Sequence, residues 1–186
     1  WHAASLFLHF SCSFLVFLLI IRFGAEKWSA MAGALLFLVH GSRPEAVFWT
    51  GAQFDLWATL FFLIAFLAFD SWLRDGLRPS AAVCFAALLC AFMSKESAYV
   101  APLAFLFSPS LIHRKWRERW MRTAPVFLLA AVCFCYRWVI LGGIGGYRDS
   151  VQRPFIFSIG WRTLKGLTTR LGAILTFPIN WSKPIE

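Results

Sequence analysis

The sequence predicts an all-α fold: a polytopic bundle of about six membrane-inserted helices, with an amphipathic helix at the membrane surface. The chain has 186 residues, of which 60% are hydrophobic and 15% charged, and its mean hydropathy is +0.67. Soluble domains are about half apolar and about a quarter charged. The 21 Phe and 10 Trp residues are typical of rings that face lipid and its interface. This composition excludes a soluble globular domain, a disordered chain and a disulfide scaffold.

The apolar runs define the predicted spans. A helix needs about 20 apolar residues to cross the hydrocarbon of a bilayer, and three runs approach or exceed this: 3–23, 54–72 and 124–141. Three shorter runs correspond to roughly 20 Å of helix each: 28–40, 81–93 and 98–112. A helix formed by such a short run either ends below one surface of the membrane or includes flanking residues to reach it. We therefore expect residues 1–141 to form the helical bundle.

Residues 142–186 have a different character and are predicted to form an outer-side loop with an interfacial helix. A glycine-rich stretch at 142–146 precedes a segment, 158–177, whose leucines and cations fall on opposite helical faces. A basic amphipathic helix of this kind lies in the plane of the interface. An additional membrane span is the alternative for this segment.

The distribution of cations predicts the orientation. If the first run starts outside, the gaps on the inner side hold nine cations: Arg22, Lys27, Arg74, Arg78, Arg114, Lys115, Arg117, Arg119 and Arg122. The outer gaps before residue 141 hold two, Arg43 and Lys95. This is a positive-inside bias. Because the net charge of +9 sits in short gaps between apolar runs, it indicates membrane topology, and no nucleic-acid partner is expected.

Two outer turns carry the candidate functional residues. Both turns, 41–53 and 94–97, adjoin short runs, so we expect them to lie below the outer surface and to line one polar cavity. Ionisable groups at such depth cost several kcal/mol unless they are paired or used. The first turn places these groups in sixteen residues: His40, Arg43, Glu45, Gln53 and Asp55. A structural ion pair of Arg43 with Glu45 or Asp55 is the alternative.

The second turn contains Lys95 and Glu96. The ammonium group of Lys95 is suited to an anion such as a phosphate, and Glu96 to neutralising Lys95 or binding a sugar hydroxyl. A lone ion pair at a helix hairpin explains them equally well. Arg137 and Arg148 add guanidinium groups on the same side, suited to a phosphate; Arg137 instead snorkels to the interface in the simpler interpretation.

Histidines and cysteines give a weaker signal. His2 and His9 share one helical face two turns apart, and a histidine that faces the bundle interior is a functional candidate. Core packing with a satisfied hydrogen bond is the favoured alternative for them. The five cysteines lie in apolar runs without a CxxC pair, and no group of residues has zinc-site spacing. The residues indicate no cofactor, and a divalent metal is left open.

The pattern His40-x4-Glu45-Ala-Val-x-Trp49, followed by Gln53-x-Asp55-Leu, resembles a segment of bacterial GT-C-fold membrane glycosyltransferases. These include the protein O-mannosyltransferases and the transmembrane, TPR-carrying mannosyltransferases. The Ser94-Lys95-Glu96 turn, the helix with His2 and His9, and Arg137-Trp138 with the following glycines are similar to further parts of that family. The chain departs from the pattern at Gly41, where the family usually has Pro, and at Gln53, where it usually has Arg.

The resemblance implies a hexosyltransferase that uses a sugar on a polyprenyl phosphate. A carboxylate would act as general base on the hydroxyl of a protein, lipid or glycan acceptor, and cations would stabilise the departing phosphate. The implied catalytic residues are His40, Glu45 and Asp55. The implied substrate-binding residues are Arg43, Gln53, Lys95, Glu96, Arg137, Arg148, His2 and His9. The interfacial helix would guide the lipid carrier, and the location would be the bacterial inner membrane with an extracytoplasmic active side.

The family's main catalytic acid lies in an outer loop before the helix that begins this chain. We therefore expect an internal piece of a longer protein that is inactive by itself. Two other function classes remain open: a multi-pass transporter or lipid flippase, which would require repeats with broken helices, and a non-catalytic membrane scaffold.

Overall fold

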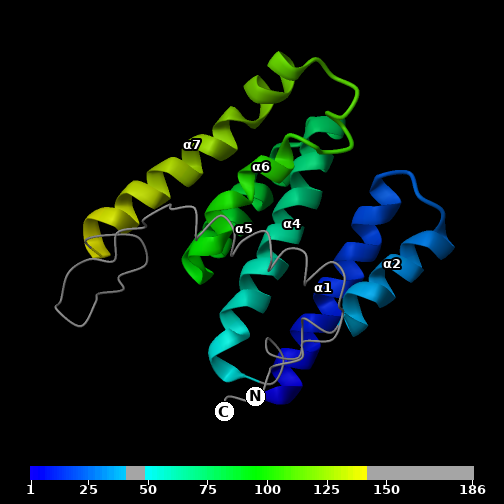
Figure 1. Cartoon of the computed structure of the whole chain (residues 1–186). Coiled ribbons are helices and arrows are strands. Elements are labelled where there is room, and N and C mark those ends of the chain that lie inside the picture. Colours follow the sequence, from blue (N-terminus) through cyan, green and yellow to red (C-terminus); the bar gives the residue numbers. More distant parts are fainter. Residues whose placement is uncertain (41–48, 142–186) are drawn as a thin grey trace, which may run out of the picture.

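A computed structural model describes residues 1–40 and 49–141, and within these ranges the fold is all-helical, without a β-strand. Four long or medium helices form its frame: α1 (His2–Arg22), α4 (Gln53–Asp75), α5 (Arg78–Ser94) and α7 (Trp116–Leu141). The shorter elements are α2 (Lys27–Val39), η1 (Thr50–Ala52), η2 (Glu96–Val100) and α6 (Pro102–Phe105). Figure 1 shows the helices as an elongated bundle with α4 between α1 and α5.

Three helices are long and apolar enough to cross a membrane: His2–Arg22, Gln53–Asp75 and Trp116–Ile140. They coincide with the three long apolar runs of the sequence. Their lengths of 21, 23 and 25 residues match the roughly 20 residues that a hydrocarbon core requires. The all-helical prediction is confirmed for the described residues, and three of the roughly six predicted membrane-inserted helices have the length and apolar composition to cross a membrane. The amphipathic helix expected at 158–177 lies outside the described residues.

Small residues allow the helices to approach one another. The buried positions of α2 are Ala30 and Ala34, and they face α1, which buries Ser5, Cys12 and Ser13. In α4 and α5 the buried set likewise includes several alanines. Because lipid tails are as apolar as the helices, membrane helices associate through close backbone approach and interhelical hydrogen bonds rather than through the hydrophobic effect. The bond from Ser13 Oγ to the Ala34 carbonyl, at 2.8 Å, is one of these.

Helical direction alternates along the chain. α1 and α2 form a hairpin, α4 returns parallel to α1, and α5 runs back beside α4, so the N-terminus of the chain and the start of α4 lie at one end of the bundle (Figure 1). Gly76 closes α4 with φ +65°, a left-handed conformation that favours glycine, and its amide donates to the Trp72 carbonyl at 2.9 Å. This turn connects α4 to α5 at the opposite end.

The predicted short span at 98–112 is not a single helix. After α5 the chain passes through η2, the single turn of α6 and a series of tight turns to residue 115. Pro102 and Pro109 lack the amide hydrogen that a continuous helix needs, and each restricts the residue before it. We call residues 95–115 the interrupted crossing.

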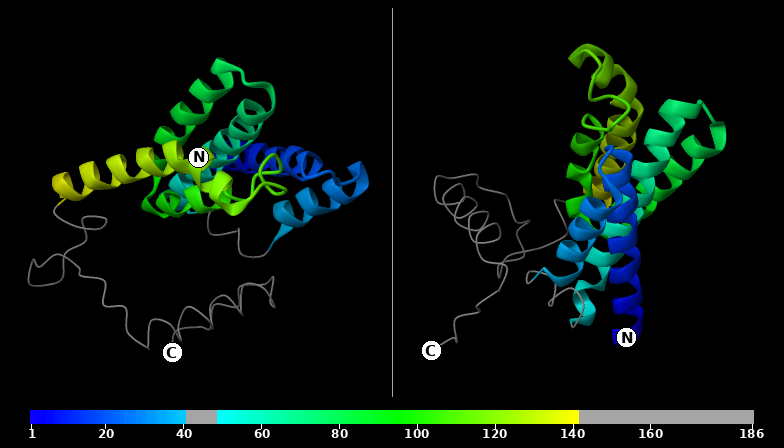
Figure 2. Two further views of the ribbon diagram at one scale, coloured as in Figure 1. Left: turned by 90° about the horizontal axis from the view of Figure 1, so that it is seen from above. Right: turned by 90° about the vertical axis from the view of Figure 1, so that its right-hand side faces the viewer.

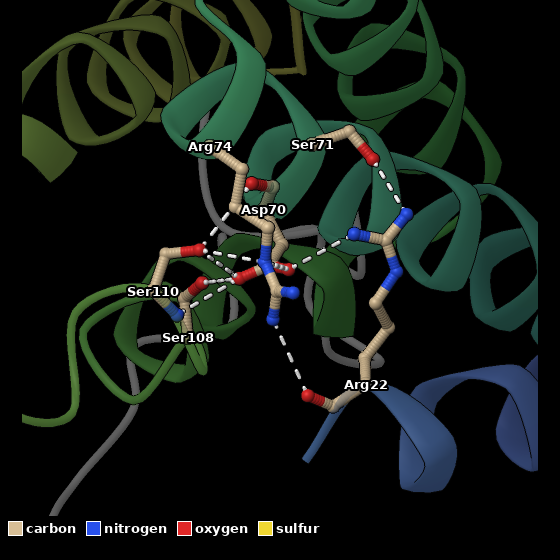
Figure 3. Close-up of polar contacts among 6 residues, drawn as sticks. All are labelled: Arg22, Asp70, Ser71, Arg74, Ser108 and Ser110. Carbon is tan, nitrogen blue, oxygen red and sulfur yellow. Dashed lines mark hydrogen bonds and ion pairs between the residues drawn. The ribbon is translucent and has the colours of Figure 1, made fainter. Parts of the chain in front are cut away.

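A buried carboxylate fixes the far end of the interrupted crossing. The Oδ1 atom of Asp70 accepts hydrogen bonds from Ser108 Oγ at 2.8 Å, from Ser110 N at 2.9 Å and from Ser110 Oγ at 2.6 Å. Its Oδ2 atom pairs with Arg74 Nε at 2.9 Å and with an Arg22 guanidinium nitrogen at 3.5 Å. Figure 3 shows these groups converging from α1, α4 and the turn at 108–110.

We call this side of the bundle the arginine end. Besides the Asp70 cluster it carries Lys27 and Arg78 at the starts of two helices, and the basic segment 113–122 that leads into α7. The cations that the sequence assigned to inner gaps therefore gather at one end. The membrane face that this end occupies is a prediction from the positive-inside rule.

Aromatic side chains fill the space between α4, α5 and the interrupted crossing. Phe105 is fully buried and meets Phe62, Phe66 and Phe69 with ring centroids 6.0, 5.2 and 5.0 Å apart. Tilted and edge-to-face contacts at such distances are favourable beyond the area that they bury. The irregular backbone of the crossing is thus packed against protein, which is the condition for non-helical backbone at membrane depth.

Candidate functional site

Two ion pairs lie at the end of the bundle opposite the arginine end, and both join elements distant in sequence. Lys95 Nζ lies 2.6 Å from Asp55 Oδ2, and an Arg137 guanidinium nitrogen lies 3.4 Å from Glu96 Oε2. We call this region the ion-pair end. It joins the start of α4, the end of α5, the start of η2 and the last turns of α7.

The local backbone explains why two adjacent residues, Lys95 and Glu96, reach different partners. α5 ends at Ser94, and Lys95 adopts an extended conformation with φ −155° and ψ 144°. Successive side chains on an extended backbone point in opposite directions. Lys95 therefore reaches α4, while Glu96 reaches α7. The neighbouring Lys95–Glu96 pair that the sequence allowed is replaced by two pairs that each cross the bundle.

Both ion pairs are open to solvent or a ligand. The side chains of Lys95 and Asp55 are 34% and 40% exposed, and those of Arg137 and Glu96 are 24% and 36% exposed. Ion pairs of this exposure contribute only about 0–1 kcal/mol to stability in water. Their energetic role as braces is small, and their charges are available to an incoming group.

A groove of about 260 Å³ runs beside the Lys95–Asp55 pair, between α4 and η2. Its polar wall includes Asp55, Thr59 and Ser97, and its apolar wall includes Phe62 and Val100. The hydroxyl of Thr59 donates to the Asp55 carbonyl at 2.7 Å, so its oxygen lone pairs remain available to the groove. The groove thus combines a carboxylate, hydroxyl groups and an apolar surface next to an ammonium group.

Two buried polar atoms at the same end have no hydrogen-bond partner among the described residues: Tyr99 Oη and Arg137 Nε. The ring of Tyr99 is held by Phe92, with centroids 4.9 Å apart and nearly parallel planes, and by Phe134 at 5.6 Å. Buried polar groups are nearly always paired, so unpaired ones call for an explanation. Both donors are covered by protein, so they mark this end as polar in its interior without being exposed to a ligand.

The structure brings some of the predicted residues together. Asp55, Lys95, Glu96 and Arg137 form the ion pairs, Gln53 begins α4 beside them, and His2 begins α1 at the same end of the bundle (Figure 1). His40 ends α2 in an extended conformation. Arg43, Glu45 and Arg148 lie outside the described residues, as does most of the turn at 41–53.

His9 is a core residue. Its ring is buried, its Nε2 atom lies 2.9 Å from the Leu38 carbonyl, and its centroid is 5.6 Å from that of Phe37. The ring links α1 to α2. The Nε2 contact agrees with the packing interpretation, while the buried Nδ1 atom has no hydrogen-bond partner among the described residues, so the role of His9 stays a prediction.

The Asp70 cluster was not predicted as a site. Asp70 lies near the end of the run 54–72, and the sequence counted Arg22 and Arg74 only as topology signals. The available signal was the spacing of Asp70 and Arg74, which puts the two charges one helical turn apart inside a membrane helix. The polar groups of the Asp70 cluster form hydrogen bonds and ion pairs with one another, which indicates a structural role rather than ligand binding.

Within residues 1–40 and 49–141, no three His, Cys, Asp or Glu side chains are close enough to hold a metal ion. The described residues of the ion-pair end supply cations, carboxylates and hydroxyl groups. The chain matches no protein-family model, no curated protein and no solved structure.

Proposed function

We propose that the chain belongs to a membrane glycosyltransferase that moves a sugar from a polyprenyl-phosphate donor to an acceptor hydroxyl at the ion-pair end. The observation that carries the proposal is the gathering of Lys95, Arg137, Asp55 and Glu96 at one end, half-exposed and beside a groove. The resemblance of the turns around His40 and Lys95 to GT-C-fold transferases supports it. In this proposal the ion-pair end faces the extracytoplasmic side of a bacterial inner membrane.

The chemistry follows from the residues. A polyprenyl phosphate leaves as an anion, and the cations of Lys95 and Arg137 stabilise the charge that develops on it. Arg137 offers a planar guanidinium, which suits phosphate oxygens. A carboxylate accepts the proton of the acceptor hydroxyl. Asp55 is the described candidate for this role or for orienting the sugar, and Glu45 is the candidate that the resemblance implies.

Single substitutions in the intact protein test this assignment. Lys95→Ala is expected to lower sugar transfer from a synthetic polyprenyl-phosphate sugar by about 10²–10³-fold, because it removes a donor aimed at the leaving group. Glu45→Gln is expected to abolish transfer as well. Lys27→Ala, at the arginine end, is the matched control and should leave transfer unchanged.

The double substitution Asp55→Lys with Lys95→Asp separates catalysis from bracing. It restores an ion pair of reversed polarity, so a purely structural pair would recover both folding and transfer. We expect the swapped variant to keep a thermal unfolding temperature in detergent close to that of the unaltered protein, without recovery of transfer. Full transfer by the swapped variant would contradict the proposed role of Lys95.

One observation favours a second candidate, a transporter or flippase. The interrupted crossing places non-helical backbone across the bundle, as the broken helices of transporters do. Reconstitution in vesicles with a fluorescent polyprenyl-phosphate analogue distinguishes the two. Movement of the lipid between leaflets without sugar transfer would favour the flippase.

A further inference from the structure

A groove on the outward face of α7 lies next to the most basic segment of the chain. The groove is shallow and open, all of its lining residues belong to α7, and it extends along the helix from Trp120 to Ala131, around Pro125, with a volume of about 730 Å³. It is almost entirely apolar, and Met121 and Leu128 on its walls are 56% and 67% exposed. It is distant from the ion-pair end, and the proposed transferase does not use it.

The basic segment enters the same face of the helix. Arg117, Met121, Ala124 and Leu128 are spaced i, i+4, i+7 and i+11, which places them in one line along α7. Arg117 therefore lies one turn beyond the mouth of the groove. Trp116 and Trp120 flank this position with ring centroids 5.9 Å apart, and both are exposed. Tryptophan is enriched at membrane interfaces.

The cations of this segment divide into two groups. Arg114 and Arg122 share Glu118 at 3.6 and 3.0 Å, and Arg119 donates to the carbonyls of Ile112 and Arg114. Lys115 and Arg117 are exposed and make no ion pair or side-chain hydrogen bond within the described part of the chain. Two uncompensated cations thus remain directed to the surroundings at the groove's mouth.

The dimensions of the bilayer set the depth of these features. The apolar stretch of α7 begins after Arg122, and Arg117 lies five residues before that point, about 7.5 Å along the helix axis, where the headgroup layer is expected. From Trp120 to Ala131 the groove covers about 16 Å, which is close to the depth of one leaflet. Cations at headgroup level and an apolar groove one leaflet deep match the two parts of a phospholipid.

We propose that this face of α7 binds an anionic phospholipid, with an acyl chain in the groove from Trp120 to Ala131 and the headgroup phosphate on Arg117 and Lys115. The positive charge of segment 114–122, with five cations and one carboxylate, favours an anionic lipid over a neutral one. Clusters of this density next to a membrane helix attract anionic lipids. The site is independent of the proposed transferase activity.

Native mass spectrometry of the intact protein released from nanodiscs tests the headgroup contact. The nanodiscs contain equal amounts of phosphatidylglycerol and phosphatidylcholine. We expect retained lipid to be mainly phosphatidylglycerol, and Lys115→Ala with Arg117→Ala to reduce this preference at least about fivefold, since each cation near an anionic surface contributes about that factor. The matched control is Lys27→Ala with Arg78→Ala, which removes equal charge at the same end and should retain the preference.

A second variant tests the groove without changing charge. Ala124→Phe fills the groove and is expected to lower the amount of retained lipid, whereas Ala86→Phe adds the same ring to an exposed position of α5 and should not. Equal retention of the two lipids by the unaltered protein would overturn the proposal. So would an unchanged preference after removal of Lys115 and Arg117, or retention by Ala124→Phe equal to that of its control.

Discussion

The two ends of the bundle use charge in different ways. At the arginine end one carboxylate, Asp70, is 1% exposed and receives bonds from serines and arginines until its oxygens are saturated. At the ion-pair end Asp55 is 40% exposed and, among residues 1–40 and 49–141, has one ionic partner, Lys95. A saturated buried carboxylate holds elements together, whereas a half-exposed pair leaves its charges accessible. Burial and the number of partners therefore distinguish the structural charge from the candidate functional one.

The two ends of the bundle are predicted to lie on opposite sides of the membrane. Cysteine labelling tests this with an all-or-none result. In a background without the five native cysteines, single cysteines replace Gly51 and Arg117. A membrane-impermeant maleimide applied from one side is expected to label one position, and the other only after permeabilisation. Labelling of both from the same side would contradict the predicted topology.

The largest expected change in stability is at Asp70. Asp70→Asn removes the charge that holds Arg22 and Arg74. Because the carboxylate is buried but the two arginines are 36% and 42% exposed, the expected cost is that of losing one hydrogen-bonded charged group, about 1.5–3 kcal/mol. We expect a corresponding loss in the free energy of unfolding, measured by denaturant titration in detergent micelles.

Asp75→Asn is the control for this substitution, since Asp75 is exposed one turn further along the same helix and should change stability by less than about 0.5 kcal/mol. If the two variants had equal free energies of unfolding, the Asp70 cluster would contribute no more to stability than an exposed charge does. The two ends of the bundle would then not differ in how they use charge.

A smaller effect is expected at the ion-pair end. Glu96→Gln removes the partner of Arg137 but leaves a polar group of the same shape, so the free energy of unfolding should fall by about 1 kcal/mol or less. The same titration measures it, with Ser97→Ala as the neighbouring control. A loss as large as that of Asp70→Asn would identify Glu96 as a structural anchor and remove it from the proposed site.

Sequence reasoning found the long helices because length and hydropathy are local properties. The runs at 3–23, 54–72 and 124–141 correspond to α1, α4 and α7, although α7 begins eight residues earlier, at Trp116, with a polar turn outside the apolar run. The run at 98–112 was wrongly expected to be one helix, because hydropathy does not report backbone hydrogen bonding. Pro102 and Pro109 were the available signals.

The sequence did not predict which charged residues form ion pairs with one another. The candidate residues Lys95 and Asp55 were assigned to the same side of the membrane, yet forty positions separate them and only the packing of α4 against α5 brings their charges together. Glu96 was expected near Lys95 and instead meets Arg137, which depends on the extended backbone at Lys95. Asp70 had no assigned role because its serine partners lie in the segment whose conformation was not foreseen.

The interrupted crossing has a consequence for biosynthesis. A segment of tight turns exposes backbone carbonyls and amides that lipid does not satisfy, so it is not stable in the bilayer before its protein neighbours are present. The apolar helices α1, α4 and α7 have the length to insert independently, as in two-stage assembly. The ribosome synthesises residues 95–115 before α7. We therefore expect this segment to stay near the insertion machinery until α7 has been synthesised and packs against it.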